Sequence, residues 1–266
     1  MVKKILSVTV CVAVLLFIYA PILLLVVYSF TDSNVIGKWD GFSLELYAQL
    51  FRDAEIMQIL FNTVWLALAA AVLSTLLGTA GAIGIFYSKR KFAKPLQAAS
   101  QIPVINAEIV TAISLALLFS ALFLYRTYFS LIVGHMVLCT PFVVLSVMPK
   151  LKQMDPNIYE AALDLGASPS AALFKVVVPQ IFSGILSGFM LSITLSLDDY
   201  IVTAFTKPPL FDTISTYVYN AVKNGTNSST PALRALSALI FIVMIAVVLA
   251  INLRARKPAA GKEASK

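Results

Sequence analysis

Three carboxylates stand within apolar stretches of the sequence, where acidic side chains are rare. Glu108 lies in one long apolar run, and Asp198 and Asp199 lie next to each other in another. A charged side chain at the middle of a membrane-spanning helix costs about 2.5–3.5 kcal/mol on insertion scales, so such acids usually face a protein interior or a watery path. A path lined by carboxylates suits a cation, and Tyr200 and Phe205 could add cation–π contact. The candidate substrate-pathway residues are therefore Glu108, Asp198, Asp199 and Tyr200.

Other interpretations of these polar residues stay open. Asp198 or Asp199 could cap a broken helix, and Glu108, if protonated, could donate to a carbonyl freed by Pro103. An adjacent acid pair could also serve a membrane-embedded enzyme, but neighbouring side chains on a helix point about 100° apart. No Ser/His or metal-spaced His/Glu set accompanies the pair. His135, the single histidine, is expected to form hydrogen bonds between helices rather than to bind a ligand.

The segment 155–179 predicts two short helices joined by a glycine. An Asp-Pro pair at 155–156 and a Ser-Pro pair at 168–169 each place a capping side chain directly before a proline, which is a preferred helix start. Gly166 lies between them, where helices commonly end on a residue of positive φ. No Lys or Arg occurs between residues 153 and 174. A helix lying on lipid is usually basic on its polar face, so we expect a protein to dock on this segment.

The elements that position all these residues are membrane-spanning helices. Hydrophobic residues make up 59% of the 266-residue chain and charged residues 12%, whereas soluble domains have about 45–50% and about 25%. This composition predicts an all-α, polytopic membrane protein and argues against a soluble enzyme. The glycines 78, 81 and 84 predict a small-residue packing face in the second span. A span needs about 20 apolar residues, and six segments qualify, at about 5–29, 60–87, 99–124, 129–149, 179–206 and 232–253.

The distribution of basic residues predicts the orientation of the chain. The net charge of +7 does not indicate nucleic-acid binding, because Lys and Arg occur in short runs between apolar segments and not on one solvated face. With six spans, 14 of the 20 Lys and Arg residues fall on the same side as both termini. Basic loops remain in the cytoplasm. We therefore expect the N- and C-termini to be cytoplasmic.

The segment 155–179 resembles the EAA loop of ABC importer permeases. Glu160, Ala161 and Ala162 are followed after three residues by Gly166, and after nine more by the run 176–179 (VVVP). The family pattern has Ile and Leu where this run has its first and third valines. The resemblance implies the all-α fold of a type I ABC importer permease, with a single transmembrane permease domain over residues 1–266. It also implies that Glu160, Ala161, Ala162 and Gly166 contact a cytoplasmic ATPase subunit.

Nearly the whole chain resembles the membrane subunits of spermidine/putrescine importers, and the second of the two subunits most of all. The runs that carry this likeness are 28–33 (YSFTDS), 139–144 (CTPFVV) and 195–199 (LSLDD). The likeness implies a polyamine cargo and a multi-pass protein of the bacterial inner membrane that forms half of a translocation pathway. It further implies three kinds of partner: a homologous second permease, two ATP-binding subunits that hold ATP and Mg, and an extracytoplasmic substrate-binding protein.

The sequence leaves two alternative functions. The chain contains no Gly-rich phosphate loop ending in Gly-Lys-Ser/Thr, so we expect no cofactor in it and no ATP hydrolysis by it. Within the importer class the cargo could instead be phosphonate, thiamine or ferric iron, although an anionic cargo would favour a cationic residue within a span. Outside that class the chain could be a membrane-embedded enzyme that uses Asp198 and Asp199.

Overall fold

The computed structural model describes residues 2–31, 33, 38–155, 157–224, 233–242 and 245. Regular secondary structure among these residues is helical, apart from one isolated antiparallel bridge between Thr31 and Phe42. The all-α prediction is therefore confirmed for the described chain. The chain forms two compact units, Met1–Met57 with Val218–Lys266 and Gln58–Tyr217.

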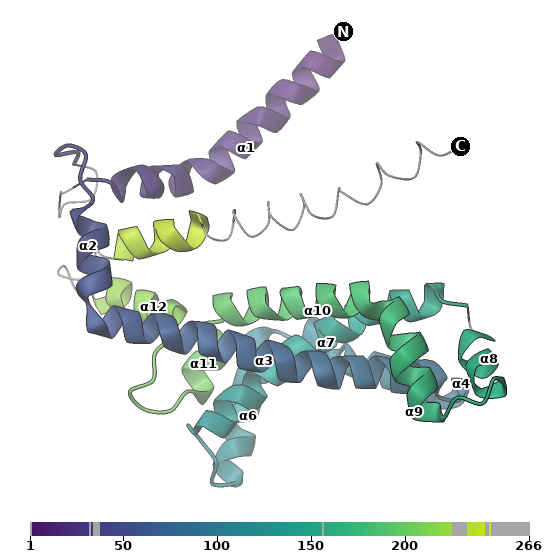
Figure 1. Ribbon diagram of the computed structural model, residues 1–266. Helices are drawn as coiled ribbons and strands as arrows, with labels where there is room; N and C mark the ends of the chain where they lie inside the picture. The colour runs from purple at the N-terminus through teal and green to yellow at the C-terminus, as the bar shows by residue number, and fades with distance from the viewer. Residues whose placement is uncertain are drawn as a thin grey trace. The chain divides into compact units, whose positions relative to one another are not determined.

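Figure 1 labels the helices in chain order. The first unit contains α1 (Val2–Tyr28), α2 (Glu45–Arg52) and the helix Leu233–Ile242. Two helices cross the boundary between the units, α3 (Ala54–Tyr87) and α12 (Ile214–Asn224). The second unit holds α4 (Arg90–Ser100), α5 (Ile102–Ile105), α6 (Glu108–Ala121), α7 (Tyr128–Gln153), α8 (Asn157–Asp164), α9 (Pro169–Ala172), the π-helical turn η1 (Leu173–Val177), α10 (Val178–Asp198) and α11 (Ile201–Thr206).

Four helical stretches are long and apolar enough to cross a membrane. They are Thr9–Tyr28, Ala54–Tyr87, Tyr128–Gln153 and Pro169–Asp198, and they overlap four of the six predicted spans. Many of their large apolar side chains are exposed, such as Phe17, Phe61 and Phe182. An outward-facing apolar surface is what lipid contact requires. The sixth predicted span, 232–253, is helical over Leu233–Ile242, and beyond Ile245 its remainder and the basic tail lie outside the described residues.

The third predicted span, 99–124, is not one continuous helix, and in this respect the prediction was wrong. The stretch Arg90–Ile105 and helix α6 meet at an angle of 104°. The backbone is extended at Asn106 and Ala107, with ψ of 147° and 132°, so the ladder of helical hydrogen bonds stops there. Across the break, the side-chain Nδ2 of Asn106 donates a hydrogen bond to Thr111 Oγ1 at 3.2 Å. Glu108 consequently lies in the first turn of α6 and not in the middle of a helix.

The fifth predicted span, 179–206, is also divided. The helical stretch begins earlier, at Pro169, and ends at Asp198. The backbone is extended at Asp199, with ψ of 124°, and the short helix α11 begins two residues later. The apolar character of the sequence continues through this break, which is why hydropathy alone did not reveal it.

Small residues bring α7 and α10 close together. Gly184, Gly188 and Ser192 recur at four-residue spacing along α10, and all three are buried. A Cβ atom on Gly184 would lie 2.9 Å from the backbone oxygen of Ser146 on α7, and one on Gly188 would lie 3.1 Å from Val143 Cα. Of the three glycines predicted to form a packing face on α3, Gly78 alone approaches a neighbouring helix, whereas a Cβ on either of the others would meet open space.

The contact at Gly184 predicts a selective loss of stability. We expect Gly184→Ala to lower the thermal unfolding midpoint of the purified protein in detergent, because overpacking against a backbone atom typically costs about 1–3 kcal/mol. Gly81→Ala is the matched control: it has open space around its Cβ, and alanine is favoured over glycine in a helix by about 0.5–1 kcal/mol. Equal midpoints for the two variants would show that the close approach of α7 and α10 is not as described.

Candidate functional site

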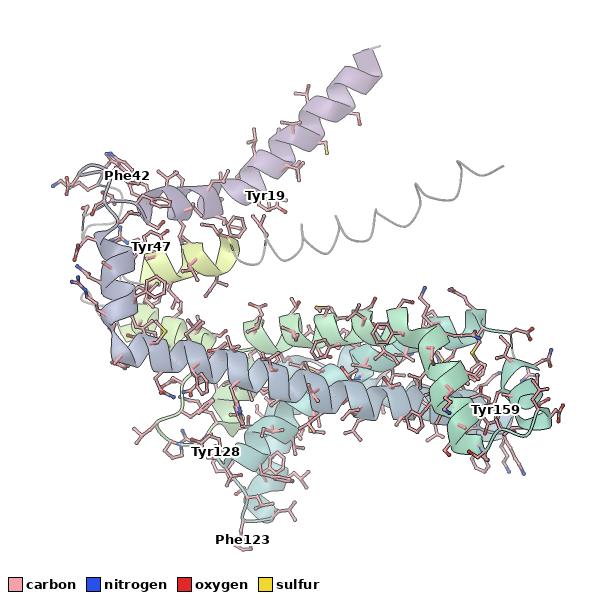
Figure 2. The ribbon with its side chains drawn as sticks, viewed as in Figure 1. Tyr19, Phe42, Tyr47, Phe123, Tyr128 and Tyr159 are labelled. Atoms are coloured by element: carbon pink, nitrogen blue, oxygen red, sulfur yellow. The ribbon has the colours of Figure 1, made fainter. Side chains whose placement is uncertain are left out.

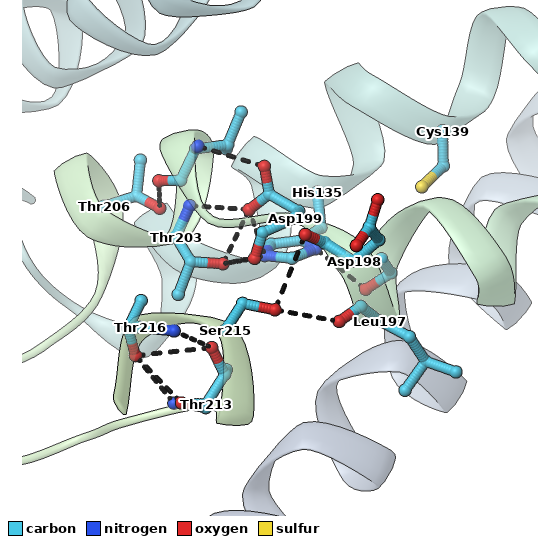
Figure 3. Close-up of polar contacts among 12 residues, drawn as sticks. His135, Cys139, Leu197, Asp198, Asp199, Thr203, Thr206, Thr213, Ser215 and Thr216 are labelled. Atoms are coloured by element: carbon cyan, nitrogen blue, oxygen red, sulfur yellow. Dashed lines mark hydrogen bonds and ion pairs between the residues drawn. The ribbon is translucent and has the colours of Figure 1, made fainter. Parts of the chain in front are cut away.

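The break between α10 and α11 is held open by the side chain of Asp199. Its Oδ1 accepts a hydrogen bond from the Val202 backbone N–H at 3.1 Å, and its Oδ2 accepts one from the Thr203 N–H at 2.7 Å. The Thr203 hydroxyl donates to the same Oδ2 at 2.6 Å (Figure 3). Tyr200 stands at the N-cap position of α11, and the Asp199 carboxylate one residue earlier satisfies first-turn N–H groups as an N-cap side chain does. The carboxylate is buried, with 5% of the residue exposed. The capping interpretation is therefore confirmed for Asp199.

Asp198 has a different environment from its neighbour. It is exposed, and no described residue forms a hydrogen bond with its carboxylate. Its backbone carbonyl and that of Leu197 accept hydrogen bonds from the Ser215 hydroxyl at 3.5 and 3.2 Å, as Figure 3 shows. Ser215 thus satisfies carbonyls at the C-terminal end of α10, which helical bonding leaves unpaired. Of the two adjacent acids, Asp199 is therefore a buried capping residue and Asp198 carries an exposed carboxylate.

His135 lies on α7 and joins both halves of the broken helix. Its Nδ1 is 2.8 Å from Ser196 Oγ in the last turn of α10, and its Nε2 is 3.0 Å from Thr203 Oγ1 at the start of α11. Nε2 is also 3.6 Å from Asp199 Oδ2. The side chain is fully buried. The prediction that His135 forms hydrogen bonds between helices is confirmed.

The structure brings Glu108 to the same place, although it lies about 90 residues earlier in the sequence. Helix α6 packs against α11, and this packing brings the Glu108 carboxylate within electrostatic range of Asp198 and Asp199. Among the described residues, no Lys or Arg forms an ion pair with any of these acids, and Lys207 pairs instead with Asp212. The bend before α6 makes this meeting possible. Tyr200 follows the acid pair directly and is half-buried.

The predicted helix–glycine–helix loop is present. The Asp155 carboxylate accepts a hydrogen bond from the Asn157 N–H at 3.0 Å at the start of α8, while Pro156 lies outside the described residues. Gly166 has a φ of +85°. The Ala167 N–H donates to the Ala162 carbonyl at 3.0 Å, and the Gly166 N–H donates to the Leu163 carbonyl at 2.9 Å. This pair of bonds is a Schellman motif, which places a left-handed residue at C′, the position directly before its last residue.

One face of the loop is anchored to the spans and the other is free. The ring centroid of Tyr159 on α8 lies 5.1 Å from that of Tyr87 at the C-terminal end of α3. Figure 2 labels Tyr159 at the end of the second unit where α8 lies. Ile158 packs against the core formed by α3, α7 and α10. Glu160 and Ala161 are exposed, and Leu165 is 90% exposed. An exposed leucine beside an exposed Glu-Ala pair is an accessible surface for a protein.

Sequence reasoning missed several residues of this site. Ser196, Thr203 and Ser215 were not singled out, because hydroxyl side chains are common and satisfy themselves locally in helices. Two signals were available in the sequence. Asp199 and Thr203 are separated by one helical turn, and Ser192 and Ser196 continue the four-residue spacing of the α10 glycines.

The sequence of residues 76–257 matches the family described as "Binding-protein-dependent transport system inner membrane component". The chain belongs to this family. It is accordingly a non-catalytic, multi-pass membrane subunit of a transport system, and the alternative of a membrane-embedded enzyme was wrong. The capping role of Asp199 agrees with this conclusion, because a carboxylate committed to backbone hydrogen bonds is poorly placed to share a reaction with Asp198.

Three curated permease proteins are similar to the chain over most of its length. The putrescine transport system permease protein PotI of Escherichia coli K12 is 34% identical over 235 residues, which cover 84% of this chain and 81% of the relative. The spermidine/putrescine transport system permease protein PotC of the same strain is 33% identical over 250 residues, covering 94% and 93%. PotC of Haemophilus influenzae is 31% identical over 241 residues, covering 91% and 93%.

Solved structures confirm the permease fold. A chain of a bacterial ABC transporter involved in the import of the acidic polysaccharide alginate superposes with a TM-score of 0.73 at 13% identity, covering 96% of both chains. A chain of the alginate transporter in complex with an alginate pentasaccharide-bound periplasmic protein gives 0.70 at 19% identity, covering 96% and 94%. At these identities the likeness establishes the fold and not the cargo.

Proposed function

We propose that this family member is one of two permease subunits of an ATP-driven importer for polyamines. The observation that carries the proposal is the meeting of Glu108, Asp198 and Asp199 with no Lys or Arg paired to them among the described residues. Carboxylates of a membrane protein that have no Lys or Arg partner attract cations, and polyamines are chains of protonated amines. The names of the relatives, which concern putrescine and spermidine, agree with this chemistry.

The three acids have separate parts in the proposed pathway. The exposed Asp198 carboxylate is free to accept hydrogen bonds from an ammonium group. The C-terminal end of α10 adds a negative partial charge next to it, because helix dipoles favour cations at that end. Glu108 and the buried Asp199 deepen the negative potential, and Tyr200 offers an aromatic ring beside the acid pair. Broken helices have the same role at the transport sites of other transporters, where the ends of the half-helices bind the charged groups of the cargo.

The loop 155–179 is the proposed contact with the ATPase. Glu160, Ala161, Ala162 and Gly166 would lie against an ATP-binding subunit, and the anchored face of α8 would transmit its movement to α3, α7 and α10. ATP and Mg would be held by two such subunits, and no cofactor is needed in this chain. A homologous second permease would complete the pathway, and an extracytoplasmic binding protein would deliver the cargo.

The proposed orientation places both termini in the cytoplasm, as the distribution of basic residues favours. A reporter that is active only outside the cytoplasmic membrane should therefore be silent when it is fused after Lys266 and active when it is inserted in the loop after α1. Activity of the fusion after Lys266 would contradict both the orientation and the even number of spans.

Uptake in a strain that lacks its own polyamine importers tests the function. The complete transport system, with this chain present or deleted, is supplied with labelled putrescine and spermidine, and copurification with an ATP-binding subunit is measured in parallel. We expect uptake that depends on the chain and copurification with the ATPase. Chain-dependent uptake of phosphonate, thiamine or ferric iron in place of polyamines would support the importer class and contradict the proposed polyamine cargo.

A further inference from the structure

The buried side chain of His135 bridges the break that carries the acids. We infer that His135 is a positioning residue for transport: it holds α10 and α11 in a fixed arrangement against α7, so that Asp198 faces the pathway. This inference rests on the proposed function, because the pathway gives the position of Asp198 its importance. The inference depends on the contacts of the His135 ring with the hydroxyls of Ser196 on α10 and Thr203 on α11.

The direction of the hydrogen bonds follows from counting protons. The Thr203 hydroxyl has one proton, and it donates this proton to Asp199 Oδ2 in the 2.6 Å hydrogen bond between them. The direction is fixed because an ionised carboxylate accepts hydrogen bonds and does not donate them. Thr203 Oγ1 must therefore accept from His135 Nε2–H, 3.0 Å away. His135 Nδ1 then carries no proton and accepts from the Ser196 hydroxyl at 2.8 Å. The chain of donors runs from Ser196 through His135 and Thr203 to Asp199.

This series of hydrogen bonds connects α10 to α11, which the backbone hydrogen bonds of a continuous helix no longer do. Where α10 ends, its helical hydrogen bonds stop, so the direction of α11 depends on contacts with other elements. Helix α7 provides three of these contacts. Besides the imidazole, the Ser130 hydroxyl donates to the Thr206 carbonyl at 2.9 Å, and Gly134 lies so close to Val202 that a Cβ would be 2.9 Å from its Cγ1.

His135 differs from the other α7 contacts because it touches both sides of the break. The Ser130 and Gly134 contacts reach α11 alone. Cys139, one turn further along α7, contacts α10 alone, through the Ser192 carbonyl at 3.5 Å. The imidazole is therefore the α7 group that relates α10 to α11 directly. Its loss should change the position of Asp198 without removing any charge from the pathway.

The first test is the concentration dependence of polyamine uptake by the assembled transporter. We expect His135→Leu to raise the half-saturating spermidine concentration about tenfold, while the amount of transporter in the membrane and its copurification with the ATPase stay unchanged. His135→Gln can still donate to Thr203, and we expect it to restore much of the affinity. Cys139→Ala removes a buried α7 contact away from the break, and it should leave the half-saturating concentration unchanged.

A second test does not depend on the cargo. Asp198→Cys is placed in a background in which Cys11 and Cys139 are replaced, and its rate of labelling by a membrane-impermeant thiol reagent is measured with and without His135→Leu. We expect His135→Leu to change this rate several-fold, because the junction shifts. An unchanged labelling rate, or an equal loss of affinity in Cys139→Ala, would overturn the inference. Failure of the wild-type transporter to take up polyamines would reject the proposed function and leave the labelling result to decide the role of His135.

Discussion

Replacing Asp198 by asparagine is expected to reduce polyamine uptake about tenfold or more, with no change in the amount of folded protein. A tenfold effect corresponds to about 1.4 kcal/mol. This is well within the roughly 4 kcal/mol between unit charges 4 Å apart near a protein surface. The fold should tolerate the change, because the Asp198 carboxylate is exposed and no described residue forms a hydrogen bond with it. Uptake of labelled spermidine and putrescine, together with membrane levels of the protein, measures both effects.

The neighbouring acid gives a matched control for this prediction. Asp198→Ala should transport as poorly as Asp198→Asn, since both lose the charge and neither loses a cap. Asp199→Ala should instead lower stability by about 0.5–2 kcal/mol, the usual cost of removing an N-cap, because it leaves the start of α11 unsatisfied. The more highly charged spermidine should be affected more than putrescine. Normal uptake of both by Asp198→Asn and by Glu108→Gln would remove the electrostatic support for a cationic cargo.

Replacing Gly166 by valine is expected to abolish coupled transport while the protein still inserts in the membrane. Gly166 has a φ of +85°, and a β-branched residue in this region costs about 1–3 kcal/mol of strain. The chain would relieve this strain by opening the Schellman bonds at Ala167 and Gly166. The direction of α9 from α8 would then change, and the proposed contact with the ATPase would weaken. Copurification with the ATPase and substrate-stimulated ATP hydrolysis measure the loss.

Two further variants separate coupling from general strain. Gly166→Asn should retain most of the transport, because asparagine tolerates the left-handed conformation. Gly41→Val introduces comparable strain in the other compact unit, at a φ of +108° with open space around the Cβ, and it should leave ATPase binding normal. If Gly166→Val hydrolyses ATP and transports at the wild-type rate, the loop 155–179 is not the coupling element.

The local features of the chain followed from the sequence because their causes are local. The cap at Asp155, the left-handed glycine at 166 and the cap at Ser168, which accepts a hydrogen bond from the Ala171 N–H at 3.3 Å, depend on residues within one turn of each other. Apolar composition likewise indicated the four long helices, since a span is defined by its length and its transfer free energy. The spacing of the EAA pattern was sufficient to indicate the family.

The arrangement of the acids was decided by the tertiary structure. Hydropathy is equally high on both sides of a helix break, so the bends at Asn106 and Asp199 left no signal in the segments 99–124 and 179–206. The adjacent acids Asp198 and Asp199 are chemically identical, and only the direction of α11 makes one of them a buried cap and the other an open carboxylate. The meeting of Glu108 with both depends on the packing of α6 against α11, a contact between residues about 90 positions apart. Sequence patterns report periodicity along one helix, whereas these properties arise from the angles between helices.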